Sequence, residues 1–175
     1  MYDTNKIKAV VFAAYKAKQN KLVDLNGLPI QVHIIKVANQ FSDSSNEKAL
    51  ALLHDVIEDG VMTYGDASKV LYESYINCSN KSMTDIIDDV DDMLYELCII
   101  TRDPEETKTY EGYMKYIKRI RSFPLARKVK IADLRHNAFR PLPVGKINDK
   151  DIERITKYLK ALMILEAKEY EMVNG

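Results

Sequence analysis

The chain has 175 residues, of which 46% are hydrophobic and 30% charged, so it is long enough to form one soluble domain around a hydrophobic core. Its 26 basic and 26 acidic residues give a formal net charge of zero, which provides none of the basic excess typical of nucleic-acid-binding proteins. Two cysteines, no signal-peptide pattern and no apolar run near the ~20 residues of a membrane span indicate a cytoplasmic protein with reduced thiols.

Apolar residues recur at helical spacing nearly throughout the chain. This spacing predicts a first helix from about Thr4 to Asn20 and a second around residues 32–38. Between them, residues 23–29 contain an Asn-Gly pair and a proline, which predict a loop. A third helix follows the polar stretch 42–46 and is expected to carry His54 and Asp55. We assign no element to residues 60–81.

The second half of the chain predicts four more helices. They run from about Ser82 to Ile100, from Asp103 to about Ser122, from Pro124 to Asn137 and from Asp149 to about Met172, with a loop at residues 141–145. The acidic residues between positions 85 and 92 interleave with apolar positions and lack the spacing of a calcium-binding loop, so we expect a solvated face. The apolar positions expected inward on the last helix are Ile152, Ile155, Leu159, Leu162 and Leu165. Without an internal repeat or linker, residues 1–175 are expected to form one all-α domain.

One short segment concentrates ionisable side chains directly behind a core-type apolar run. His54, Asp55, Glu58 and Asp59 follow the apolar residues 49–53. Charged groups are seldom buried unless they are paired or bound to a metal. If the segment is helical, His54 lies above Glu58 and Asp55 above Asp59, because residues four apart share a face. The segment is therefore either a solvated helix end or part of a metal site.

Two other predicted helices carry residues that could complete a metal site. His33 lies in an apolar helix, where it is either a satisfied core residue or a ligand. Asp133 occupies an otherwise apolar helix interior and therefore needs a cation. Helix bundles often build metal sites from side chains on facing helices. A mixed set of imidazoles and carboxylates suits manganese, iron, zinc or nickel better than calcium.

The order His, His-Asp, Asp resembles that of the HD-domain metal-dependent phosphohydrolases. The extended motifs His-Asp-Val-Ile-Glu-Asp at 54–59 and Lys-Ile-Ala-Asp-Leu-Arg-His-Asn at 130–137 are similar to those of the (p)ppGpp hydrolase domain of RelA/SpoT proteins and of small stand-alone alarmone hydrolases. The resemblance covers nearly the whole chain and implies a helical HD-domain bundle with a metal site in its core. It implies one divalent ion, Mn²⁺, with four ligands: His33, His54, Asp55 and Asp133.

The same resemblance implies an activity. Glu58 and Asp59 match the acidic pair that orients or deprotonates the attacking water and handles the leaving group. Asn137 matches a residue that lines the nucleotide pocket. The implied reaction is hydrolysis of the 3′-pyrophosphate of (p)ppGpp to GDP or GTP and pyrophosphate. The expected partner is a small nucleotide, with no membrane and no nucleic acid, and the oligomeric state stays open.

Substrate-binding residues are expected in two places. Lys130 falls near the face of Asp133, and Arg127 extends the same row, which is either a phosphate-binding row or a solvated basic face. In the first loop, where Asp24 and Gly27 are the candidates, the sequence departs from the family. The family's loop histidine falls near Gln19, and its Pro-Tyr-Ile becomes Pro-Ile-Gln at 29–31. These departures leave open another phosphorylated nucleotide or dinucleotide cofactor as substrate, or a non-catalytic nucleotide-binding member.

Overall fold

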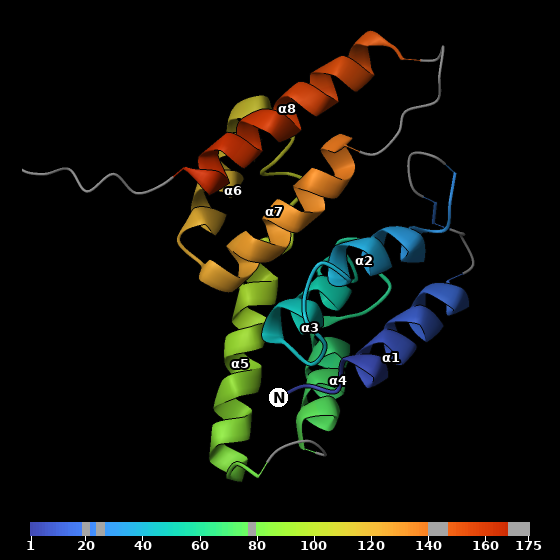
Figure 1. Cartoon of the computed structure of the whole chain (residues 1–175), viewed down its shortest axis with the longest axis vertical. Coiled ribbons are helices and arrows are strands. Elements are labelled where there is room, and N and C mark those ends of the chain that lie inside the picture. Colours follow the sequence, from blue (N-terminus) through green and yellow to red (C-terminus); the bar gives the residue numbers. More distant parts are fainter. Residues whose placement is uncertain (19–21, 24–26, 77–79, 140–146, 168–175) are drawn as a thin grey trace, which may run out of the picture.

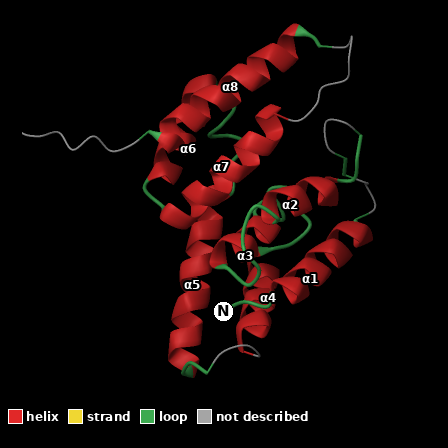
Figure 2. Cartoon of the chain, in the orientation of Figure 1, coloured by secondary structure: helices red, strands yellow, loops and turns green. Residues whose placement is uncertain are grey.

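The structure is a computed structural model that describes residues 1–18, 22–23, 27–76, 80–139 and 147–167. Within these residues the chain is helical, and the only paired extended residues form an isolated bridge between Val23 and Pro29 (Figure 2). The helices of the described residues are α1 (Thr4–Ala17), α2 (Ile30–Ala38), α3 (Asn46–Leu53), α4 (Tyr64–Ile76), α5 (Met83–Ile100), α6 (Tyr110–Arg121), α7 (Pro124–Phe139) and α8 (Asp149–Glu166).

Polar side chains determine where several helices begin. The Asp3 carboxylate accepts hydrogen bonds from two backbone N–H groups in the first turn of α1. The Ser45 hydroxyl accepts one from the N–H of Lys48 at the start of α3. At α8, Asn148 and Asp151 each accept a hydrogen bond from the other's backbone N–H and form a capping box. These caps satisfy amide groups that would otherwise lack a partner.

α7 is the central helix of the fold. It packs against α2, α3, α5, α6 and α8, and Figure 1 shows it between α8 on one side and α2 and α3 on the other. α1 and α4 pack against each other, and α1 also packs against α3 and α4 against α5. Because α2, α3 and α7 meet, His33 of α2 and His54, directly after α3, come close to Asp133 of α7.

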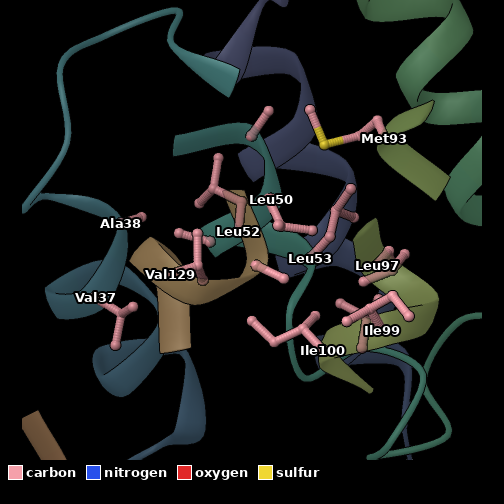
Figure 3. Close-up of a cluster of buried hydrophobic side chains, with 14 of the residues drawn as sticks. Val37, Ala38, Leu50, Leu52, Leu53, Met93, Leu97, Ile99, Ile100 and Val129 are labelled. Carbon is pink, nitrogen blue, oxygen red and sulfur yellow. The ribbon is translucent and has the colours of Figure 1, made fainter. Parts of the chain in front are cut away.

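A shared hydrophobic core joins these helices. Apolar side chains from every helix belong to one buried cluster that extends from Tyr2 to Leu165. Residues 49–53 of α3 are all buried, and Leu50, Leu52 and Leu53 lie at the centre of the cluster beside residues of α2, α5 and α7 (Figure 3). A helical segment that is apolar all round is stable only in such a setting. The shared core confirms the predicted all-α fold in one helical domain.

The structure corrects two parts of the predicted helix order. α4 lies in residues 60–81, for which the sequence pattern had yielded no assignment. α6 begins at Tyr110 rather than at Asp103, because Thr109 caps it by accepting the N–H of Gly112 at 3.0 Å. Residues 103–107 form a separate turn that packs on α6. A Cβ atom on Gly112 would lie only 1.9 Å from the carbonyl oxygen of Glu106, so this contact requires glycine.

The predicted ends of the first and last helices differ as well. α1 ends at Ala17 and α8 at Glu166, while Asn20, Met172 and residues 141–145 lie outside the described residues. On α8, Leu162 and Leu165 are buried as predicted, but Ile152 and Leu159 are exposed. The apolar positions of α8 span more of its circumference than its neighbours cover, so part of the predicted inner face meets solvent.

Two further expectations concern membrane-spanning helices and the state of the two cysteines. No helix in the described part of the chain is both long enough and apolar enough to cross a membrane. Cys98 has an exposed free thiol on α5, and Cys78 lies outside the described residues.

Candidate metal centre

Four donor atoms from three parts of the chain meet between α2, α3 and α7. Nε2 of His33 lies 3.2 Å from Oδ1 of Asp133 and 3.5 Å from Oδ2 of Asp55. Nε2 of His54 lies 3.1 Å from Oδ2 of Asp55 and 3.3 Å from Nε2 of His33. Both histidines and Asp133 are buried, and Asp55 is half-buried. The structure therefore brings all four predicted ligands together, and His33, His54 and Asp133 form a buried group that could hold a metal ion.

The His54-Asp55 pair lies on a turn and not on a helix, which corrects one expectation. α3 ends at Leu53, and the following turns are closed by hydrogen bonds from Val56 N–H to the Leu53 carbonyl at 3.1 Å and from Asp59 N–H to the Asp55 carbonyl at 2.8 Å. In an α-helix, consecutive side chains diverge by about 100°. The turn instead directs both side chains to the same centre, and Gly60, with φ of +61°, ends it.

Hydrogen bonds on the far side of each imidazole prepare Nε2 for coordination. Nδ1 of His54 donates to the carbonyl oxygen of Ala51 at 2.7 Å, so in the neutral imidazole the lone pair is on Nε2. Nδ1 of His33 lies 2.8 Å from Nδ1 of His136, so His136 can accept the Nδ1 proton and leave Nε2 of His33 for a metal ion. Such outer hydrogen bonds are typical of metal-binding histidines, because they fix the tautomer and the ring orientation.

The Asp133 carboxylate is held on both oxygens. Nζ of Lys130 lies 2.9 Å from Oδ2, and Nδ2 of Asn137 donates to Oδ1 at 2.6 Å. Burial by itself raises the pKa of Asp133, but the Lys130 ammonium and the two imidazoles outweigh it and hold the pKa well below its usual value. The carboxylate is therefore ionised and fixed in orientation.

The charge balance of the cluster favours a cation. Burial lowers the pKa of His54, but the carboxylates of Asp55 and Asp133 more than compensate and raise it to about 9. The cluster therefore holds a proton at neutral pH. A divalent ion can take the place of that proton, because metal ligands must be deprotonated. Two imidazole nitrogens and two carboxylate oxygens fit a divalent transition-metal ion.

Glu58 and Asp59 lie beside the donors in different environments. Both carboxylate oxygens of Glu58 accept from Arg102, one from its guanidinium and one from its backbone N–H. Oδ2 of Asp59 accepts the Tyr15 hydroxyl at 2.7 Å. Burial, together with the charges of Asp55 and Glu58, raises the pKa of Asp59 despite the Tyr15 hydrogen bond. Glu58 is thus ion-paired, whereas Asp59 is a partly desolvated carboxylate.

The donor cluster opens into a cavity of about 420 Å³. Its wall includes both acids, Glu58 and Asp59, and also four charged or aromatic residues that the sequence had not indicated. These four come from the segment after α5, from α6 and from α8: Arg102, Tyr113, Arg154 and Tyr158. Arg154 and Tyr158 are four apart and so share a face of a predicted helix, but nothing in the sequence shows that this face meets the metal donors.

The predicted basic row separates into residues with different roles. Lys130 lines the cavity, as does Asn137, although each also contacts Asp133. Nε of Arg127 donates instead to the carbonyl oxygen of Leu165 at 2.6 Å, and Lys128 pairs with Glu47 at 2.7 Å. Of the row, only Lys130 reaches the cavity.

The first loop supplies a second, mostly apolar cavity of about 940 Å³. Gly27 lines this cavity and not the one at the metal donors, but the two cavities share Val23 and Ile30 in their walls. Asp24 and Gln19 lie outside the described residues. Gly27 therefore lies in the wall of the apolar cavity, which adjoins the cavity at the candidate metal centre.

Comparison with known proteins identifies no relative: neither a family model nor a curated protein matches this sequence. The fold and the site define an all-α protein with a buried His-His-Asp group that could hold a metal ion.

Proposed function

We propose that this chain is a metal-dependent phosphohydrolase of the HD-domain type that removes the 3′-pyrophosphate of (p)ppGpp. The observation that carries the proposal is the convergence of His33, His54, Asp55 and Asp133 on a cavity that also exposes arginine side chains. The imidazole and carboxylate donors suit Mn²⁺, and guanidinium groups suit phosphate. The motifs at 54–59 and 130–137, which resemble those of (p)ppGpp hydrolases, support the same substrate.

When bound, the divalent ion supplies a lowered water pKa and positive charge for a phosphate group. The protein's own residues supply the proton transfer. Asp59 accepts a proton at Oδ1, since its Oδ2 already holds the Tyr15 hydroxyl. Glu58 acts through its ion pair, which keeps the Arg102 guanidinium beside the cavity. Arg102 and Arg154 then neutralise the phosphate oxygens, and the rings of Tyr113 and Tyr158 offer flat surfaces for a nucleoside.

A second candidate substrate is another phosphorylated nucleotide, such as an adenine alarmone or a phosphorylated dinucleotide cofactor. The apolar cavity beside Val23 and Ile30 favours it, because the loop there differs from the family and includes Pro29 and Ile30. Apolar walls accept a base by shape and offer no hydrogen bonds that single out guanine.

A nucleotide panel tests the proposal. Protein stripped with a chelator and resupplied with Mn²⁺ is incubated with (p)ppGpp, its adenine counterpart and a phosphorylated dinucleotide, and the products are separated by ion-exchange chromatography. We expect GDP or GTP plus pyrophosphate from (p)ppGpp, only in the presence of metal. Turnover of the adenine compounds alone would favour the second candidate. No turnover by folded, metal-loaded protein would mean that the chain is a non-catalytic binding protein.

A further inference from the structure

A groove of about 690 Å³ between α6 and α8 adjoins the metal cavity. The two hollows share Tyr113 and Arg154 in their walls. Of the charged residues that line the groove, Glu153 is acidic and the other four are basic: Lys108, Lys150, Arg154 and Lys157. An anion that extends from the metal cavity past Tyr113 would therefore meet an excess of positive charge.

Lys157 stands where the two hollows meet. Its Nζ lies 4.5 Å from the ring centroid of Tyr113 and 5.8 Å from that of Tyr158, and both rings line the metal cavity. Among the residues that the structure describes, no carboxylate forms an ion pair with this ammonium group. Its neighbours are the aromatic rings and other cations.

Four of the surrounding cations are paired with a carboxylate. Lys108 pairs with Glu105, Arg154 with Asp151 and Lys130 with Asp133, while Arg102 pairs with Glu58. Neither Lys150 nor Lys157 forms such an ion pair within the described residues, and Lys157 is the one that lies against the rings of the metal cavity. Burial lowers the pKa of Lys157, and the charges of Arg102, Arg154 and Lys130 lower it further. A partly buried cation repelled by its neighbours is stabilised when an anion binds beside it.

We propose that the α6–α8 groove binds a second anionic group of the substrate, separate from the group at the metal donors, and that Lys157 selects for this second group. The inference rests on the proposed function. Lys150 and Lys108 extend the positive charge along the groove. The capped N-terminus of α6, which begins directly after Thr109, forms part of the same wall and adds its positive partial charge.

Two substrates that differ only in the second anionic group test this selectivity. They are guanosine 3′,5′-bis(diphosphate) and guanosine 3′-diphosphate, and the measured quantity is the ratio of their kcat/KM values. Lys157→Gln should lower this ratio roughly tenfold, the usual scale for a lost charge-assisted phosphate contact. Lys150→Gln should lower it less. The control is Lys118→Gln, an exposed lysine in the last turn of α6, which should leave the ratio unchanged. An unchanged ratio in folded Lys157→Gln overturns the proposal.

A binding measurement separates this inference from the proposed function. Calorimetric titration compares GDP, which retains only the second anionic group, with guanosine, which has neither. The parent should bind GDP more tightly than guanosine. In Lys157→Gln the ratio of the two affinities should be roughly tenfold smaller. If no nucleotide is hydrolysed but the tighter binding of GDP than of guanosine depends on Lys157, the hydrolase proposal is wrong and the proposal of an anion-binding groove is supported. If hydrolysis occurs but Lys157→Gln binds GDP as tightly as the parent does, only the groove proposal is wrong. If the parent shows no GDP advantage, the groove proposal is wrong.

Discussion

Lys130 and Asp133 form a buried ion pair on successive turns of α7, with 2.9 Å between Nζ and Oδ2. The sequence suggested Lys130 as a substrate-binding residue, and the structure adds a contact to a proposed metal ligand. Because the ion pair fixes the carboxylate, Lys130→Gln should weaken Mn²⁺ binding roughly ten- to a hundredfold, as loss of an outer partner commonly does. Calorimetric Mn²⁺ titration measures this. Unchanged Mn²⁺ affinity with a raised KM would make Lys130 a phosphate-binding residue instead.

The histidines should separate into ligands and a supporting residue. His54→Ala removes a proposed donor atom and should abolish bound metal and hydrolysis. His136→Ala removes only the partner of Nδ1 of His33, so it should weaken metal binding by roughly ten- to a hundredfold without abolishing it. Elemental analysis after dialysis, with circular dichroism as the folding control, compares the two variants. Equal metal loss in both folded proteins would contradict this division of roles.

The two acids beside the donors should differ in mechanism. Asp59→Asn keeps the shape of the side chain but removes a proton acceptor, so metal should stay while turnover falls about 10²-fold or more. Glu58→Gln should also slow turnover with metal retained, because it releases Arg102. If Glu58 acts through Arg102, the double variant Glu58→Gln/Arg102→Gln should be no slower than the slower single variant. If Asp59→Asn turns over as fast as the parent, Asp59 is not the proton acceptor and the role belongs to Glu58.

The stability of the metal-free protein should fall as the pH rises from about 6.5 to 9. The pKa of His54 is raised from 6.5 to about 9 in the folded state, so folding favours its protonated form. That contribution is fully present below the unfolded pKa and is lost as the pH rises through the folded one, by on the order of 3 kcal/mol. Saturating Mn²⁺ should remove this decline, because the metal binds the neutral imidazole. Urea unfolding across this pH range, with and without metal, measures both trends, and a flat metal-free profile would contradict the assigned charge balance.

The sequence pattern was sufficient for the fold class and for the buried group of His33, His54 and Asp133 that could hold a metal ion. Apolar spacing predicted α5 and α7 closely, and Asp133 was recognised because a carboxylate at a core position needs a cation. α4 was overlooked, although signals were present. Thr63 and Asp66 form reciprocal hydrogen bonds at its start, and apolar residues follow at helical spacing.

Other features depend on tertiary packing and could not be read from spacing. The turn after α3 aims two consecutive side chains at one point, which helical spacing alone does not predict. Arg127 and Lys130 lie in the same row of α7. Yet Arg127 donates a hydrogen bond to the backbone near the end of α8, while Lys130 reaches the cavity. The positions of Arg102 and Arg154 depend on how α5, α6 and α8 surround α7.

Metal content of an Asp133 variant tests the central claim most directly. Asp133 is 5% exposed and supplies a donor atom next to His33, so its removal should leave too few ligands. The parent, loaded with Mn²⁺ and freed of excess by gel filtration, should retain about one ion per chain by elemental analysis. Folded Asp133→Ala, or Asp133→Asn if alanine unfolds the protein, should retain almost none. Full metal occupancy in the folded variant would contradict the proposed centre.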